Sequence, residues 1–199
     1  MGHYRRKNAP RVRDGDVQFK SNHTLTYHWS QVHLDRYVVD RERPGVGYRH
    51  LLRQADLHRF VALLPDWEEL SRGVDVLLLA QGDPDALGWY SQGNVAVCAW
   101  RRELPGVWCT GFVEEHEPVL ERLNVPREER DDGTWLGWDE QTARGFQLMH
   151  ILLHELGHHH DRMTTRSQAR CSRGEPYAEG YALRYADELW KAYFREFGG

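Results

Sequence analysis

The pentapeptide His154-Glu155-Leu156-Gly157-His158 contains the residue types that a zinc-dependent hydrolase requires. Two histidines four residues apart stand one above the other on the same face of a helix, so both imidazoles can reach one ion. Neutral imidazole nitrogens bind zinc at about 2.0–2.1 Å. Glu155 directly follows the first histidine, where its carboxylate can take a proton from a metal-bound water instead of binding the metal. The motif therefore predicts a zinc hydrolase with Glu155 as its general base.

The segment around this motif has the pattern of a buried helix. The run from Asp139 to Asp161 contains no proline, and Asp139 can cap its N-terminus. Apolar residues occupy much of its circumference: Phe146, Met149, Ile151, Leu152, Leu153 and Leu156. A helix that is apolar nearly all round is buried, and buried imidazoles and carboxylates need partners. A metal ion would be such a partner, and the alternative is a core helix with incidental histidines.

A third metal ligand must come from elsewhere, because a catalytic zinc usually takes three protein ligands and one water. The residues that follow His158 do not continue as an extended HExxHxxGxxH motif. A second acidic segment, Glu175-Pro176-Tyr177-Ala178-Glu179-Gly180-Tyr181-Ala182, lies farther along the chain. Its two glutamates are one helical turn apart, so one can bind the metal while the other orients an imidazole.

This acidic segment resembles the glutamate helix of the gluzincins, most closely that of the ImmA/IrrE-type metallopeptidases. In that family a glutamate ligand is followed by a small residue, an Asp or Asn, an aromatic residue and an alanine. The corresponding residues here are Glu175, Ala178, Glu179, Tyr181 and Ala182, with Glu179 in place of the Asp or Asn. The resemblance covers residues 139–190.

The resemblance implies an α+β, zincin-like fold, in which a small mixed sheet packs on the HExxH active-site helix and a C-terminal glutamate helix completes the site. It implies Zn²⁺ held by His154, His158 and Glu175. Glu179 is then the residue that orients an imidazole, or the alternative ligand. The implied activity is that of a metallopeptidase that cleaves a peptide or protein substrate.

Local patterns predict the elements that position these residues. We expect helices at 48–64, 66–70 and 176–194, and strands at 74–80, 87–90, 94–100 and 107–113. Ser91-Gln92-Gly93 predicts a hairpin turn between the second and third strands. Residues 114–132 are charged and contain two prolines, which predicts a surface loop or lid with a short helix near 119–123. The edge strand, either 94–100 or 107–113, would pair with an extended peptide over the metal.

Length and charge suggest one domain with a basic tail. The 199 residues divide into a basic, flexible N-terminal arm (1–22) and a single zincin-like metallopeptidase domain (23–199). The net charge of −4 gives no general attraction to nucleic acid, and only the arm hints at it, through Arg5, Arg6, Lys7, Arg11 and Arg13. The sequence does not indicate an oligomeric state.

The remaining composition indicates a cytoplasmic protein that does not enter membranes. No apolar run approaches the roughly 18–20 residues of a membrane span, and the N-terminus lacks the apolar segment of a signal peptide. The cysteines are few and odd in number (Cys98, Cys109 and Cys171), which fits a reducing compartment.

Two other functions remain open from the sequence. One is a non-catalytic, zinc-stapled binding or regulatory module, in which protein, for instance Asp161 or Cys171, would fill the fourth coordination position. The other is a regulatory protease directed to DNA by the basic arm, although no helix-turn-helix motif is present.

For a peptidase, the donor that stabilises the oxyanion could be His150, His159 or His160. The stripe Tyr177, Tyr181 and Tyr185 on the C-terminal helix predicts core packing.

Overall fold

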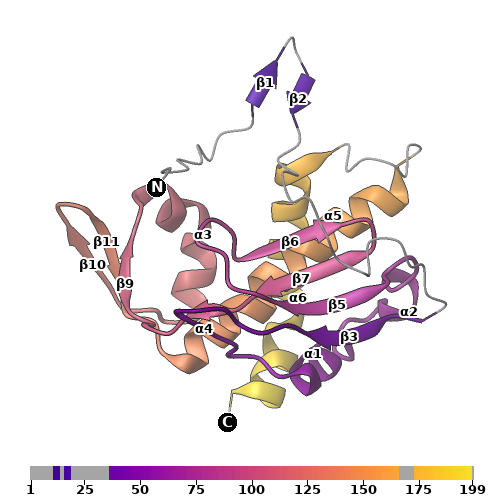
Figure 1. The fold of residues 1–199 in the computed structure, drawn as a ribbon, viewed down its shortest axis with the longest axis horizontal. Coiled ribbons are helices and arrows are strands. Elements are labelled where there is room, and N and C mark those ends of the chain that lie inside the picture. Colours follow the sequence, from indigo (N-terminus) through magenta and orange to yellow (C-terminus); the bar gives the residue numbers. More distant parts are fainter. Residues whose placement is uncertain (1–10, 14–15, 19–35, 166–172, 199) are drawn as a thin grey trace.

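Helices and four small β-sheets make up the part of the chain that the computed structural model describes, residues 11–13, 16–18, 36–165 and 173–198 (Figure 1). The strands are β1 (Arg11–Arg13), β2 (Asp16–Gln18), β3 (Val38–Arg41), β4 (Tyr48–Arg49), β5 (Val76–Ala80), β6 (Gly88–Ser91), β7 (Asn94–Cys98), β8 (Trp100–Arg101), β9 (Gly106–Trp108), β10 (Arg127–Arg130) and β11 (Gly133–Leu136). The helices are α1 (Gln54–Val61), α2 (Trp67–Leu70), α3 (Thr110–Arg122), α4 (Glu140–Phe146), the π-helical turn η2 (Gln147–Leu152), α5 (Leu153–Thr164) and α6 (Gly174–Phe197). This composition confirms the α+β class.

The largest sheet has four strands in the order β3-β5-β7-β6 and is mixed. Strands β3, β5 and β7 run parallel, whereas β6 pairs antiparallel with β7. Strand β5 is apolar and buried at every position, as its continuous apolar run predicts for an interior strand. Strands β6 and β7 contact α5, so this sheet supports the helix that carries the HExxH motif.

The predicted hairpin is confirmed, but the predicted edge strand is wrong. Gln92 and Gly93 both have positive φ values, 46° and 94°, as a two-residue hairpin turn with the twist of its strands requires. The turn places β6 outside β7, because β7 already pairs with β5 on its other side. Strand β9 belongs to a separate sheet with β10 and β11. The edge next to α5 is therefore β6, and not residues 94–100 or 107–113.

The helix predicted from Asp139 to Asp161 is present as the continuous run α4, η2 and α5. Asp139 caps it as expected, because its Oδ1 accepts the Thr142 backbone N–H at 2.7 Å. The π-helical turn, which the sequence pattern does not reveal, stands directly before the HExxH motif. Wider turns of this kind are frequent at functional sites. All six residues of η2 are buried, so the core holds this segment from every side.

Two other predicted elements are wrong in their bounds. The helix predicted at 48–64 begins only at Gln54, because Tyr48 and Arg49 form a strand with β8 instead. The strand predicted at 107–113 ends at Trp108, and helix α3 begins at Thr110. The Trp108 ring stacks on Phe112 with centroids 4.3 Å apart, so the aromatic residues pack across the strand-to-helix junction.

The region predicted as a charged loop or lid, 114–132, is mostly regular. It contains the larger part of α3, including Pro118, and then strand β10, which forms a hairpin with β11. Three apolar residues of α3, Val113, Val119 and Leu120, are buried and hold the helix against the core. The charged side chains of β10 are exposed, which explains why the segment resembles a loop in sequence.

The C-terminal helix is confirmed and is longer than predicted, since α6 runs from Gly174 to Phe197. It packs along α5.

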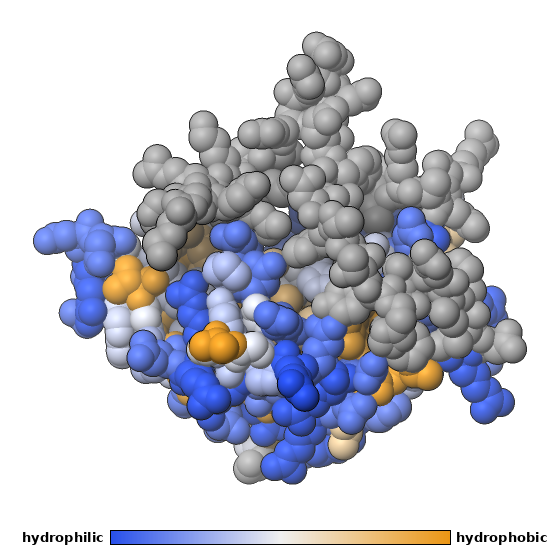
Figure 2. All heavy atoms as spheres, viewed as in Figure 1, coloured by the Kyte–Doolittle hydropathy of each residue, from blue (hydrophilic) through white to orange (hydrophobic). Residues whose placement is uncertain are grey.

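Hydrophilic residues predominate among the coloured atoms of the face in Figure 2. No helix in the described parts of the chain has both the length and the apolar character that crossing a membrane requires. In the N-terminal arm the structure describes β1 and β2, which pair antiparallel, and Arg5, Arg6 and Lys7 lie outside the described residues.

Candidate metal centre

Helices α5 and α6 contribute the four side chains that meet at the candidate site, His154 and His158 from α5 and Glu175 and Glu179 from α6. The two helices come close together because Gly157 has no side chain. A Cβ at Gly157 would lie 2.8 Å from the Cα of Ala178, which is closer than real Cβ atoms come. Ala178 is itself fully buried. The glycine of the HExxH motif therefore permits the helix contact that brings the acids to the imidazoles.

Glu175 lies between the two histidines of the motif. Its Oε2 is 3.2 Å from Nε2 of His154 and 3.6 Å from Nε2 of His158. The three donor atoms all lie within 4.8 Å of one another. A tetrahedral zinc with ligand bonds of about 2.0–2.1 Å separates its ligand atoms by about 3.3 Å. The positions and chemistry of this donor set therefore fit a divalent metal.

Glu179 occupies the opposite side of the same imidazole. Its Oε2 is 3.2 Å from Nδ1 of His154 and 3.5 Å from Nε2 of His150. If Nδ1 of His154 carries the proton, it donates to Glu179, and the Nε2 lone pair faces Glu175 and His158. Such a bond fixes both the tautomer and the orientation of a metal-binding imidazole.

The carboxylates also set the charge of the site. Burial alone would lower the pKa of His154, but hydrogen bonds to Glu175 and Glu179 outweigh it and raise this pKa to about 9. The same contacts with His154 and His158 hold the pKa of Glu175 far below its usual range. Glu175 is thus ionised, as a metal ligand must be.

A second set of donors, His150, His154 and Glu179, also converges within 4.8 Å. This second set is less accessible to solvent, because His150 is only 1 % exposed. The side chain of Glu175, in contrast, is 68 % exposed. A catalytic metal needs an open coordination position. The set with His154, His158 and Glu175 is therefore the one suited to catalysis.

Glu155 of the HExxH motif lies beside the edge strand β6. A Cβ built at Gly88 of β6 would be 2.9 Å from Oε1 of Glu155 and 2.6 Å from Cγ2 of Ile151. Burial raises the pKa of Glu155, and the nearby His154 and His158 oppose that rise only in part. A carboxyl group with a raised pKa is suited to accept and return a proton near neutral pH.

His150 supports the far side of the site. Its ring stacks on Phe146 with centroids 5.1 Å apart and meets the ring of His116 edge-on at 4.5 Å. Burial lowers the pKa of His150 to about 3, so the ring is neutral. The structure thus places His150 beside Glu179, on the Nδ1 side of His154.

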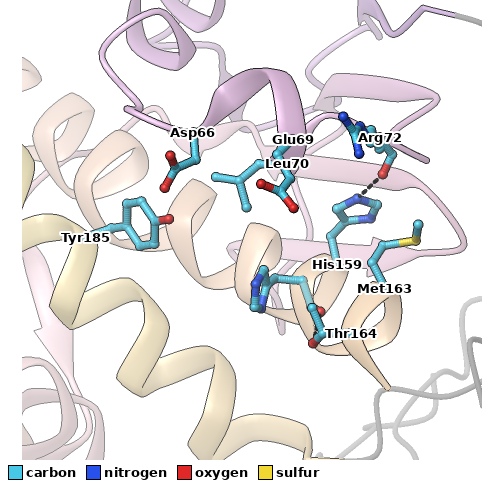
Figure 3. A pocket seen from close by; sticks show the side chains of 9 residues that line it. Asp66, Glu69, Leu70, Arg72, His159, Met163, Thr164 and Tyr185 are labelled. Atoms are coloured by element: carbon cyan, nitrogen blue, oxygen red, sulfur yellow. Dashed lines mark hydrogen bonds between the residues drawn. The ribbon is translucent and has the colours of Figure 1, made fainter. Parts of the chain in front are cut away.

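His159 and His160 line a cavity of about 370 Å³ between α2, α5 and α6, and Figure 3 shows His159 at this cavity. Nε2 of His159 donates to the carbonyl of Arg72 at 2.9 Å, and its Nδ1 is 3.2 Å from the hydroxyl of Tyr90 (Figure 3 shows the first bond). Nδ1 of His160 is 2.7 Å from the hydroxyl of Tyr177. These contacts leave neither ring near the donor set, in contrast to the hypothesis that either could stabilise an oxyanion.

Asp161, one of the two residues considered for a closed, structural site, is engaged by other donors. Both carboxylate oxygens of Asp161 accept hydrogen bonds from Arg173, and one also accepts from Gly174. Cys171 lies outside the described residues. The tyrosine stripe packs as predicted at Tyr181 and Tyr185, which are buried with ring centroids 4.5 Å apart.

Two residues of the site have no signal in the sequence. Gly88 resembles any strand glycine until the fold places Glu155 beside it. His116 lies on α3, where its Nδ1 donates to the carbonyl of Phe112 at 2.7 Å. Its proximity to His150 depends on the packing of α3 against η2, which no local motif encodes.

Comparison with known proteins adds no name to this arrangement. No protein-family model, curated protein or solved structure matches the chain.

Proposed function

We propose that this chain is a zinc-dependent metallopeptidase of the gluzincin type, in which His154, His158 and Glu175 hold the metal. The main support is the position of Glu175 Oε2, 3.2 Å and 3.6 Å from the Nε2 atoms of the two motif histidines. Three ligands with one exposed member leave a coordination position for water, which favours catalysis over a purely structural metal. The packing of a mixed sheet on the HExxH helix supports a zincin-like fold.

Zinc bound at this site would supply a Lewis acid and lower the pKa of a bound water from 15.7 to about 7. Glu155 accepts the proton of the attacking water and returns it to the leaving amine. Burial keeps the pKa of this carboxyl raised, so that it can both take and release a proton. Glu179 holds His154 by Nδ1 and directs its Nε2 to the metal position.

A peptide is the substrate class that the surroundings favour. In the described part of the chain, β6 is the outermost strand of its sheet on the side next to α5. An extended peptide can add to such an edge through main-chain hydrogen bonds. Since Gly88 of β6 lies against Glu155, a peptide paired there would pass close to the general base.

The test compares the wild-type chain with Glu155→Gln in metal content and hydrolysis. Elemental analysis should find one zinc per chain in both proteins, because Glu155 is not a ligand. Mass spectrometry of a peptide library should show cleavage by the wild type and at least a 10²-fold lower rate for the variant, as expected when a general base is removed. Zinc loss or full activity in Glu155→Gln would contradict the assigned role. Zinc binding without cleavage by either protein would favour a non-catalytic zinc-stapled module.

A further inference from the structure

The carboxylate of Asp161 connects the end of the HExxH helix to the start of the glutamate helix. Asp161 is fully buried and stands three residues after His158 on α5. Its Oδ2 accepts the backbone N–H of Arg173 at 2.8 Å and that of Gly174 at 3.0 Å. Its Oδ1 accepts the Nε–H of Arg173 at 2.9 Å. Three donors from two adjacent residues thus surround one carboxylate.

The backbone at this junction is shaped for an anion. Arg173 is right-handed (φ −89°) and Gly174 is left-handed (φ 67°), so that two successive N–H groups point to the same side. Such a pair of residues forms a concave anion-binding nest. A Cβ at Gly174 would meet nothing within 4 Å, so this glycine is needed for its conformation and not for space.

The nest also provides the N-terminal cap of α6. The N-cap residue Arg173 makes no side-chain capping bond, and Pro176 has no N–H to donate. Asp161 satisfies the N–H of Gly174, the first residue of the helix. The guanidinium of Arg173 lies over the Tyr177 ring, 3.8 Å from its centroid, and so joins the same turn to the helix.

Glu175 is the next residue after this nest. Its side chain is 68 % exposed, so packing around it does little to fix its position. The backbone at the start of α6 must therefore determine where its carboxylate lies. We propose that Asp161 is a positioning residue that sets the place of Glu175 relative to His154 and His158. This inference rests on the proposed function in that it treats Glu175 as a metal ligand.

Asp161→Asn is the main test, because it keeps the shape of the side chain and removes its charge. Asp56→Asn is the matched control: Asp56 is also buried, accepts the backbone N–H of Arg53 at 2.8 Å and pairs with Arg144, but it lies on α1. Zinc affinity, measured by competition with a chelator, should fall about 10- to 100-fold in Asp161→Asn, as for other residues that orient ligands. In Asp56→Asn it should change less than about twofold, even if both variants lose stability.

A double-mutant cycle with Glu175→Ala separates positioning from general destabilisation. If Asp161 acts through Glu175, Asp161→Asn should cause little further loss of zinc affinity once Glu175 is gone. Equal losses in both backgrounds would overturn the inference. Gly174→Ala disturbs the same nest from the α6 side and should lower zinc affinity in the same direction, which keeps the test valid if Asp161→Asn does not fold.

Hydrogen exchange of the metal-free chain tests, independently of zinc, whether Asp161 holds the start of α6. In Asp161→Asn the backbone amides of Arg173 and Gly174, which both donate to Asp161, should exchange at least tenfold faster than in the wild type, while those of α1 stay unchanged. Unchanged exchange at these two amides would refute the role of Asp161 whether or not zinc binds. A wild-type chain that binds no zinc would refute the proposed function. Faster exchange at these two amides in Asp161→Asn would, in that case, still support the role of Asp161 in holding the start of α6.

Discussion

Gly157 of α5 packs directly against Ala178 of α6, between the two helices of the candidate site. The missing side chain of one and the small side chain of the other let the α5 and α6 backbones approach, because a Cβ at residue 157 would be 2.8 Å from the Ala178 Cα and 3.0 Å from its carbonyl oxygen. Ala178 stands between Glu175 and Glu179 in α6, so the contact places one acid on each side of it. Small residues at one helix crossing thus govern the geometry of charged residues on either side.

Gly157→Ala should weaken the site without altering any ligand. The added methyl group meets backbone atoms that cannot rotate away, so α5 and α6 must separate. We expect a loss of about 1–3 kcal/mol in the free energy of unfolding, measured with urea, and a tenfold or greater loss of zinc affinity. Gly180→Ala on α6 is the control, since a Cβ there meets nothing within 4 Å. It should be neutral or stabilise by up to about 1 kcal/mol.

Glu175 and Glu179 should differ in what their removal does to zinc. Glu179→Ala removes the acceptor of the His154 Nδ1–H and should lower zinc affinity about 10- to 100-fold. Glu175→Ala removes a ligand and should lower it further, to a level similar to His154→Ala. Chelator competition measures all three. Release of zinc by Glu179→Ala and His154→Ala, but not by Glu175→Ala, would assign the metal to the His150, His154 and Glu179 set, and His150→Ala would then also release it.

Gly88→Ala should reduce catalysis while the metal stays bound. A methyl group on β6 would overlap Ile151, the Ala96 carbonyl and the carboxyl group of Glu155, and these nearest atoms include none of the three ligands. We expect lower kcat for peptide hydrolysis with unchanged zinc content. Gly106→Ala, on strand β9 with open space around its Cβ, should leave kcat unchanged and alter stability by less than about 0.5 kcal/mol. Loss of zinc from Gly88→Ala would argue against a role for Glu155 that is separate from metal binding.

Zinc should stabilise the folded chain by mass action. A ligand at 100 times its Kd contributes about 2.7 kcal/mol, which in a chain of this size corresponds to a rise in Tm of about 5–11 °C. Calorimetry before and after treatment with a chelator would measure the shift. His154→Ala is the control and should show little dependence on zinc. An equal shift in both proteins would place the bound zinc elsewhere.

The sequence identifies those parts of the molecule that local chemistry determines. The capping of α4 by Asp139 and the turn at Gln92-Gly93 follow from side chains and φ angles within a few residues, and both are confirmed. The buried strand β5 follows from its unbroken apolar run. The approach of Glu175 and Glu179 to His154 agrees with the one-turn spacing of the two acids, although no comparison identifies a gluzincin.

Elements that depend on distant partners could not be predicted in this way. Tyr48-Arg49 becomes a strand because β8 lies beside it, although its own pattern continues into a helix. Pro118 indicates a loop, but the buried face of α3 outweighs the backbone hydrogen bond that the proline cannot make. The β10–β11 hairpin had a usable signal, Asp131-Asp132-Gly133, because aspartates favour turns and glycine favours the position after the two central turn residues.

Because of the π-helical turn, the orientation of the HExxH motif depends on how many residues precede it as well as on which residues they are. Each residue advances an α-helix by about 100°, and the wider turn at 147–152 takes up extra chain between α4 and α5. Conservative apolar substitutions within the turn would leave the imidazoles facing α6. Deleting a single residue there would instead rotate the motif relative to the capped start of the helix, so that the core and the metal ligands could not both keep their orientation.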